Sequence, residues 1–131
     1  MLKSVLATLA VAELTATLTS VGADRGAANL AALQAKDPAT SVQALYEDCT
    51  AADSRRQMLC SGYISAMSDH MWLLGGDNTT RTLLGACVDT PVTYGATVQT
   101  FKNWAQKHPE KWGFDRMYGV IWALQESWPC K

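Results

Sequence analysis

Four cysteines constrain this chain more than any other feature of its sequence. In a chain of 131 residues, successive cysteines are separated by 10, 26 and 42 residues, and they are Cys49, Cys60, Cys87 and Cys130. No pair has the spacing of about two to four residues that is typical of zinc fingers, zinc ribbons or Cys-x-x-Cys redox sites. An even number of cysteines in a small chain is typical of proteins from an oxidising compartment. The pattern therefore predicts two structural disulfides.

Four cysteines allow three pairings. We favour Cys60–Cys87 with Cys49–Cys130. Cys60 lies early in an expected helix, and 26 residues let the chain run out and back to Cys87, while Cys49 and Cys130 end the first and last expected helices. The alternative is Cys49–Cys60 with Cys87–Cys130, which would link two helical hairpins.

The charge balance excludes one large class of partners. The chain has 11 Lys and Arg against 12 Asp and Glu, a formal net charge of −1, with no block of like charge. Proteins that bind nucleic acid through its backbone need a basic patch, so we expect no nucleic-acid partner. The hydrophobic content of 48% and the length favour a single folded domain.

The first residues have the layout of a bacterial signal peptide. Lys3 supplies one positive charge, and residues 5–12 form an apolar run. Val21 and Ala23 are small enough for the −3 and −1 positions of a cleavage site. We therefore expect a signal peptide over residues 1–23 and a periplasmic location.

One residue departs from this pattern. Glu13 places a carboxylate near the apolar run, which costs roughly 2–3 kcal/mol on insertion scales; the alternative is an amphipathic first helix that stays in the mature protein. No run of about 18 apolar residues occurs, so we expect no integral membrane segment in the mature chain. Residues 24–39 are rich in alanine and polar residues and are expected to form a flexible arm, followed by a domain over residues 40–131.

Residue patterns that are typical of helix starts occur within residues 40–131. Thr40 with Gln43, and Ser54 with Gln57, have the spacing of capping boxes at helix starts. Apolar residues follow each pair at helical spacing, ending near Cys49 in the first helix and continuing for four turns in the second. Two further helices are expected, one beginning near residues 90–93 and the other covering about residues 115–127.

Proline and glycine set the expected ends of these helices. Gly75-Gly76 ends the second helix, and His108-Pro109 ends the third. The last helix is expected to bury a side made of Met117, Val120, Ile121, Leu124 and Trp128. No alternating strand pattern is present. The sequence therefore predicts an all-α fold, a compact bundle of about four helices stapled by two disulfides.

The two histidines do not indicate a catalytic site. His70 follows Cys60 by ten residues, about 15 Å along one helix, so the two cannot form a catalytic dyad. A cysteine in a disulfide also lacks the thiolate that attack requires. His108 precedes Pro109, where a cation interacts favourably with the end of a helix. We expect no catalytic residue, no metal and no cofactor.

The ordered set of motifs resembles a known family. Ten residues separate Cys49 from the motif Cys60-x-Gly62-Tyr63-Ile64. The later pieces are Cys87-Val88, Pro91, Thr93, Trp104, His108-Pro109 and Trp128-Pro129-Cys130. This set, which covers about residues 42–130, is similar to the Rap/Tai family of periplasmic immunity proteins. These neutralise cell-wall amidase effectors of the type VI secretion system. The chain departs from the family pattern where Ser65-Ala66-Met67 replaces a second glycine and Tyr94-Gly95-Ala96 replaces a glutamine.

The resemblance implies both a fold and a binding mode. It implies a compact helical protein, often a homodimer, that is similar in architecture to acid-stress chaperones of the HdeA type. It also implies that a protruding loop plugs the cleft of a peptidoglycan amidase. The matching effector-binding loop here consists of Gly75, Gly76, Asp77, Asn78, Thr79, Thr80 and Arg81. The alternatives are an HdeA-like periplasmic stress chaperone and a secreted helical module with another partner.

Overall fold

The computed structural model describes residues 30–75, 85–87 and 91–131. The chain divides into two compact units, Met1–Leu33 and Gln34–Lys131. Only residues 30–33 of the first unit are described, so the expected signal peptide over residues 1–23 lies outside the described residues. The helices from residue 38 onwards all belong to the second unit.

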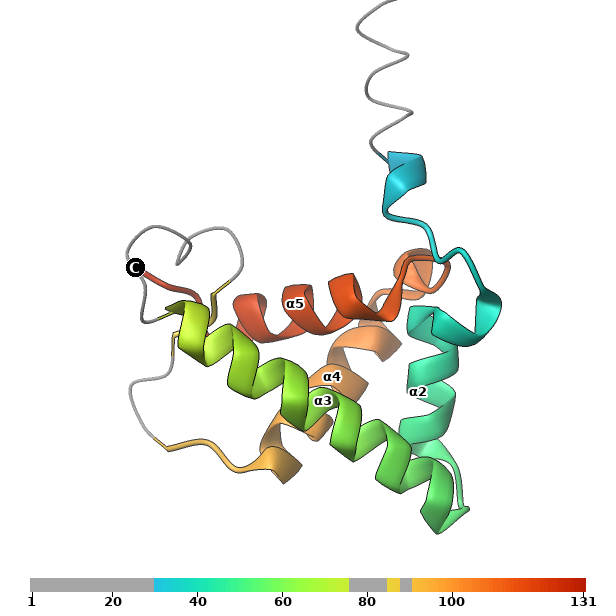
Figure 1. Cartoon of the computed structure of the whole chain (residues 1–131), viewed down its shortest axis with the longest axis horizontal. Coiled ribbons are helices and arrows are strands. Elements are labelled where there is room, and N and C mark those ends of the chain that lie inside the picture. Colours follow the sequence, from blue (N-terminus) through green and yellow to red (C-terminus); the bar gives the residue numbers. More distant parts are fainter. Residues whose placement is uncertain (1–29, 76–84, 88–90) are drawn as a thin grey trace, which may run out of the picture. The chain divides into compact units, whose positions relative to one another are not determined.

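The second unit is built from helices, as the sequence predicts. Its described residues contain no strand, only two isolated bridges, Gln34 with Phe114 and Ser41 with Asp115. The principal helices are α2 to α5; the short 3-10 helix η1 precedes α2, and η2 lies between α4 and α5. The helix α3 crosses in front of α4, and α2 lies at one end of the bundle (Figure 1). In chain order the elements are η1 (Pro38–Thr40), α2 (Val42–Thr50), α3 (Ser54–Gly75), α4 (Tyr94–Lys107), η2 (Pro109–Lys111) and α5 (Arg116–Ser127).

The first two helices begin one residue away from the expected caps. The Ser41 hydroxyl accepts a hydrogen bond from the Ala44 amide at 3.1 Å and caps α2, because Thr40 belongs to η1 and donates to Asp37 instead. The Asp53 carboxylate accepts from the amides two and three residues further on. Asp53 thus takes the role expected of Ser54, which is already part of α3.

The start of α2 is also held by the turn that precedes α5. The Val42 amide donates to the Phe114 carbonyl at 2.9 Å, and the Gln43 amide donates to the Trp112 carbonyl at 3.2 Å. The first amides of a helix have no partner inside it. These carbonyls satisfy two of them and fix the start of α2 against the segment between η2 and α5.

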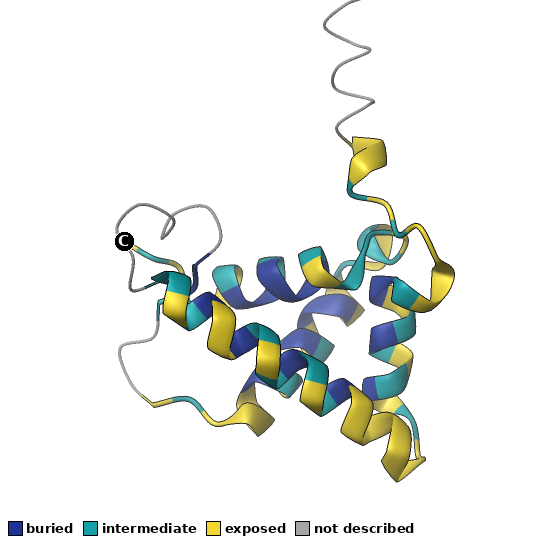
Figure 2. Ribbon diagram, in the orientation of Figure 1, coloured by how far each residue is buried: buried dark blue, intermediate teal, exposed yellow. Residues whose placement is uncertain are grey.

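The core lies where the four helices face one another (Figure 2). The expected inward stripes are largely confirmed, since Val42, Leu45 and Cys49 of α2 and Val120, Ile121 and Leu124 of α5 are buried. Met117 was expected on the buried side of α5, but 39% of its surface is exposed. It lies in the first turn of α5, before the buried residues of that helix, which begin at Gly119.

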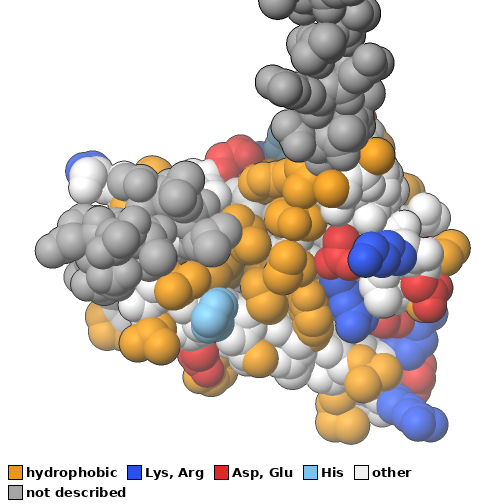
Figure 3. Space-filling view, turned by 45° about the horizontal axis from the view of Figure 1, so that its top comes forward, with side chains coloured by type: hydrophobic (Ala, Val, Ile, Leu, Met, Phe, Trp, Pro, Cys, Tyr) orange, Lys and Arg blue, Asp and Glu red, His pale blue; other side chains and the backbone are white. Residues whose placement is uncertain are grey.

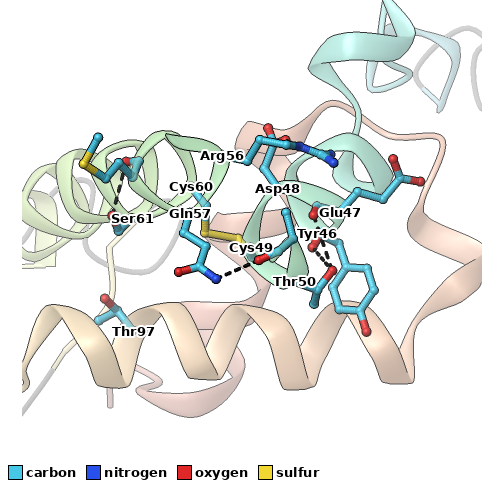
Figure 4. Close-up of a disulfide and its surroundings, with 12 residues drawn as sticks. Tyr46, Glu47, Asp48, Cys49, Thr50, Arg56, Gln57, Cys60, Ser61 and Thr97 are labelled. Carbon is cyan, nitrogen blue, oxygen red and sulfur yellow. Dashed lines mark hydrogen bonds and ion pairs between the residues drawn. A yellow bond between two sulfur atoms is a disulfide. The ribbon is translucent and has the colours of Figure 1, made fainter. Parts of the chain in front are cut away.

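The two expected disulfides are present, but the favoured pairing is wrong. Cys49 bonds to Cys60 and Cys87 bonds to Cys130, with Cα–Cα distances of 5.1 and 4.9 Å. Figure 4 shows the first bridge between the end of α2 and the start of α3. The favoured pairing assumed that the chain returns alongside α3 to Cys60. It returns instead at the far end of α3, about 22 Å from Cys60 at 1.5 Å per residue.

A substitution at Gly119 can test how closely α5 packs against α2. A Cβ atom at this position would lie 2.6 Å from Val42 Cγ2, and both residues are buried. We expect Gly119→Ala to lower the free energy of unfolding by about 1–3 kcal/mol, measured by urea denaturation, because overpacking displaces the neighbours.

The matched control is Gly95→Ala in α4, where the nearest atom to an added Cβ is Thr93 Oγ1 at 3.9 Å. We expect this variant to be unchanged or slightly more stable, since alanine favours a helix. Equal stability of the two variants would contradict the close packing at Gly119.

Candidate functional site

The residues on either side of the segment 76–84 lie together at the end of α3. Gly75 ends α3, and a Cβ atom there would clash with the carbonyl oxygen of Ala86. The Ala86 amide donates to the Met71 carbonyl at 3.3 Å. The chain therefore comes back onto the last turn of α3 directly beside the point where it left, and glycine is required for this close approach.

Three further contacts hold the returning chain. The Cys87 amide donates to the Trp128 carbonyl at 2.9 Å, just after α5. The Gln125 side chain donates to the Gly85 carbonyl at 3.3 Å. The Cys87–Cys130 disulfide then joins this segment to the C-terminal end of the chain. We call this set the loop base: Gly75, Gly85, Ala86, Cys87, Gln125, Trp128 and Cys130.

Of the expected effector-binding loop, the structure describes only the first residue. Gly75 is in the loop base, whereas Gly76, Asp77, Asn78, Thr79, Thr80 and Arg81 lie outside the described residues. Both ends of the intervening segment are attached to α3 and to the end of α5. The spacing of the cysteines does not predict this attachment. The attachment depends on contacts between segments that are far apart in the sequence.

His108 belongs to a polar cluster between α4 and α5. Its Nδ1 lies 3.1 Å from Glu110 Oε1 and its Nε2 lies 3.7 Å from Glu126 Oε2. The Trp104 indole donates to the same Glu126 oxygen at 3.0 Å, and its ring tilts over that of His108. The backbone N–H of Glu110, and then His108, lower the pKa of the Glu110 carboxyl.

The chemistry of this cluster is that of a structural link. A groove of about 530 Å³ adjoins it, lined by Trp104, His108, Lys111, Trp122, Gln125 and Glu126. This lining offers His108 no serine or cysteine to activate as a nucleophile. The Trp104–Glu126 hydrogen bond instead ties the end of α4 to α5. The sequence did not reveal this pair, because its members are 22 residues apart and belong to different helices.

A second side-chain link joins α3 to α4. The Tyr94 hydroxyl donates to both carboxylate oxygens of Asp69 at 3.1 Å. This hydrogen bond, and then the negative charge of Asp69, raise the pKa of Tyr94. Tyr94 belongs to the segment Tyr94-Gly95-Ala96, which replaces a glutamine of the related pattern, and its hydroxyl makes this contact with Asp69.

The described residues contain neither a free cysteine thiol nor a cluster of side chains that could hold a metal ion. All four cysteines are in disulfides. Within residues 30–75, 85–87 and 91–131, no three His, Cys, Asp or Glu side chains gather closely enough to hold a metal ion. The helices in these ranges also include none with the length and apolar content needed to cross a membrane.

Comparison with known proteins identifies one family. The family model of the Rap1a immunity proteins matches residues 41–130. The match begins at Ser41, which caps α2, and ends at Cys130, so it contains the helices α2 to α5 and both disulfides. Neither the curated proteins nor the solved structures contain a match to the chain.

The two disulfides should differ in how much they stabilise the fold. Their cysteines are 11 and 43 residues apart, and a bridge that closes a longer loop restricts the unfolded chain more. We expect Cys87→Ser/Cys130→Ser to lower the free energy of unfolding by about 4 kcal/mol and Cys49→Ser/Cys60→Ser by about 3 kcal/mol, measured by guanidinium denaturation. A larger loss for the Cys49–Cys60 variant would contradict this order.

Proposed function

The chain belongs to the family of Rap1a immunity proteins, and we propose that it protects the cell that makes it by binding and blocking a type VI secretion effector. The observation that carries this proposal is the family match over residues 41–130, which covers the whole disulfide-linked bundle. In this role the protein is an inhibitor and not an enzyme. Its function requires a surface that fits the effector and no reactive group of its own.

We propose a peptidoglycan amidase as the target and the periplasm as the place of action. The sequence motifs resemble those of immunity proteins against cell-wall amidases. Two disulfides favour an oxidising compartment such as the periplasm. An enzyme that cleaves peptidoglycan would meet the inhibitor in that same compartment. Export would use the signal peptide expected over residues 1–23.

We propose that the segment Gly75–Arg81 enters the amidase cleft. The loop base supports this mode, because attachment of both ends of the segment limits the entropy that the loop loses on binding. The residues that follow Gly75 include Asp77, Asn78 and Arg81. Their side chains can donate and accept hydrogen bonds inside a polar cleft.

A double substitution in the loop tests this mode. We expect Asp77→Ala/Arg81→Ala to weaken binding to the peptidoglycan amidase encoded beside this gene by at least about tenfold, because buried polar contacts at the centre of an interface carry much of its affinity. Isothermal titration calorimetry would measure the dissociation constant, and hydrolysis of purified peptidoglycan would measure inhibition.

The matched control is Gln106→Ala/Lys107→Ala, two exposed residues at the end of α4. This control should bind and inhibit like the unmodified protein. An unmodified protein that neither binds nor inhibits the neighbouring amidase would overturn the proposed function. Full inhibition by the loop variant would overturn only the proposed binding mode.

Acid stability separates this function from that of a stress chaperone. The buried polar side chains of the described residues belong to Ser41, Ser68 and Thr97, none of which titrates. The lowered pKa of Glu110 means that its contribution to stability is present at neutral pH and is lost as the pH falls through that pKa. Glu110 is exposed, so this loss should be small.

We therefore expect the native fold to persist at pH 3, whereas a chaperone of the HdeA type must open there to hold its clients. Near-ultraviolet circular dichroism and a thermal melt at pH 3 and pH 7 would measure this. Loss of the near-ultraviolet signal at pH 3, together with suppression of client aggregation, would favour the chaperone.

A further inference from the structure

Aromatic side chains of α4 and α5 form a row that reaches the surface. The rings of Tyr118 and Trp122 are stacked with their centroids 5.9 Å apart, and Trp122 meets Trp104 of α4 at 6.1 Å. Tyr118 and Trp122 lie four residues apart, which places them on one side of α5. Both are half-buried, so each keeps part of its surface in solvent. The row therefore offers a ligand an extended aromatic surface.

Two rings of this row line the groove of about 530 Å³ beside His108. We call it the aromatic groove: Trp104, His108, Lys111, Trp122, Gln125 and Glu126. Exposed hydrophobic side chains alone do not single it out, because Figure 3 shows such side chains gathered across the middle of one face of the molecule, with acidic and basic side chains at the right-hand side. The distinguishing feature of the groove is its mixture of two indole rings with four polar side chains.

Three polar groups of the groove have hydrogen-bonding capacity that the described residues do not use. The contacts of Glu126 given above all involve Oε2, so its Oε1 accepts from no described residue. None of the ion pairs within residues 30–75, 85–87 and 91–131 uses Lys111. In the same ranges the buried side-chain nitrogen without a partner belongs to Trp72. The Trp122 indole N–H, which donates to none of the described residues, therefore reaches solvent.

The charges that line the groove balance each other. Lys111 contributes an ammonium group and Glu126 a carboxylate. The Lys111 Nζ lies 5.3 Å from the ring centroid of Phe114 and 5.5 Å from that of Trp122, so aromatic faces hold it. A strongly ionic ligand would meet a like charge as well as an opposite one, and an apolar ligand would bury polar groups without partners. The lining favours an uncharged ligand with both apolar surface and hydrogen-bonding groups.

We propose that the aromatic groove binds an oligosaccharide of N-acetylated amino sugars, the class of sugar that forms the glycan chains of peptidoglycan. The C–H groups on one face of a sugar ring carry a partial positive charge, which suits the negative face of an indole ring. The acetamido group has one N–H donor and one carbonyl acceptor. The donor matches Glu126 Oε1, and the acceptor matches the Trp122 N–H or the Lys111 ammonium group.

The length of the aromatic row favours a chain of sugars over a single one. Tyr118 stacks on Trp122 but does not line the groove, so the aromatic surface continues beyond it. The flexible side chain of Lys111 can leave the indole face to a sugar ring and donate to its hydroxyl groups. The choice of peptidoglycan as the source of the sugar rests on the proposed function, whereas the groove itself does not. Binding there would keep the inhibitor at the wall that the amidase attacks.

The first test compares two sugars with the same linkage. Isothermal titration calorimetry would measure the dissociation constants of the β-linked tetramer of N-acetylglucosamine and of the corresponding tetramer of glucose. The glucose tetramer has a hydroxyl group in place of each acetamido group. We expect the N-acetylated tetramer to bind at least about tenfold more tightly, because only its amide pairs with both the carboxylate and the indole N–H. Equal affinities, or no saturable binding of the N-acetylated tetramer, would overturn the proposal.

A conservative substitution tests the carboxylate. Glu126→Gln keeps an oxygen for the Trp104 N–H but replaces Oε1 with an amide nitrogen, which cannot accept from the sugar. We expect binding of the N-acetylated tetramer to weaken at least about tenfold, since a hydrogen bond to a charged acceptor is lost. The matched control is Glu110→Gln, because Glu110 also faces His108, at 3.1 Å, but does not line the groove. The control should bind normally, and equal affinity of the two variants would contradict the proposal.

Removal of the ring tests the aromatic surface. Trp122→Leu should abolish saturable binding of the N-acetylated tetramer, and tetramer binding by a folded Trp122→Leu variant would overturn the proposal. Trp122 also packs against Trp104, Phe114 and Tyr118, so a thermal melt of this variant is measured alongside. If the variant does not fold, the comparison of Glu126→Gln with Glu110→Gln still decides.

Two further ligands distinguish the possible sources of the sugar. Peptidoglycan glycan chains freed of their peptides should compete with the N-acetylated tetramer, whereas the saccharide of deacylated lipopolysaccharide should not. Competition by the lipopolysaccharide saccharide alone would overturn the assignment to the cell wall. Amidase binding is measured separately, without sugar. A protein that binds the tetramer but no amidase would keep the groove site and lose the proposed function, and the reverse result would overturn the groove site alone.

Discussion

The Cys87–Cys130 disulfide is the constraint on which the presentation of the proposed site depends. The chain leaves α3 at Gly75 and comes back onto the same turn through the hydrogen bond from Ala86 to Met71. These backbone contacts form a junction with α3 alone. The disulfide and the Cys87–Trp128 hydrogen bond fasten that junction to the end of α5, which is packed in the core. The Cys49–Cys60 disulfide acts locally, at the turn between α2 and α3.

The helices could be predicted from the sequence because their ends are set by neighbouring residues. Glycine at position 75 and proline at position 109 end α3 and α4 where expected. The caps of α2 and α3 were misplaced by one residue because two adjacent polar residues competed for each role, as with Thr40 and Ser41. Such errors are small, since local chemistry decides among a few neighbouring positions.

The disulfide pairing could not be predicted in the same way. It depends on where the chain comes back after α3, and this is decided by contacts of Ala86 and Cys87 with Met71 and Trp128. No local pattern encodes those contacts. The Trp104–Glu126 link and the Tyr94–Asp69 link were missed for the same reason. Gly62 was visible in the sequence as part of a motif, but only the open space around it shows that its role is not internal packing.

In the proposed function, the bundle acts by recognition of an effector rather than by chemistry. The loop base would hold the segment that enters the effector.

The central claim is that the Cys87–Cys130 bond holds the loop in the form that inhibits the effector. The most direct measurement is amidase inhibition by Cys87→Ser/Cys130→Ser compared with Cys49→Ser/Cys60→Ser, at a temperature where both variants retain the circular dichroism of the folded protein. The account predicts that the first variant loses at least about tenfold in inhibition constant and that the second stays close to the unmodified protein. Equal inhibition by the two variants would contradict it.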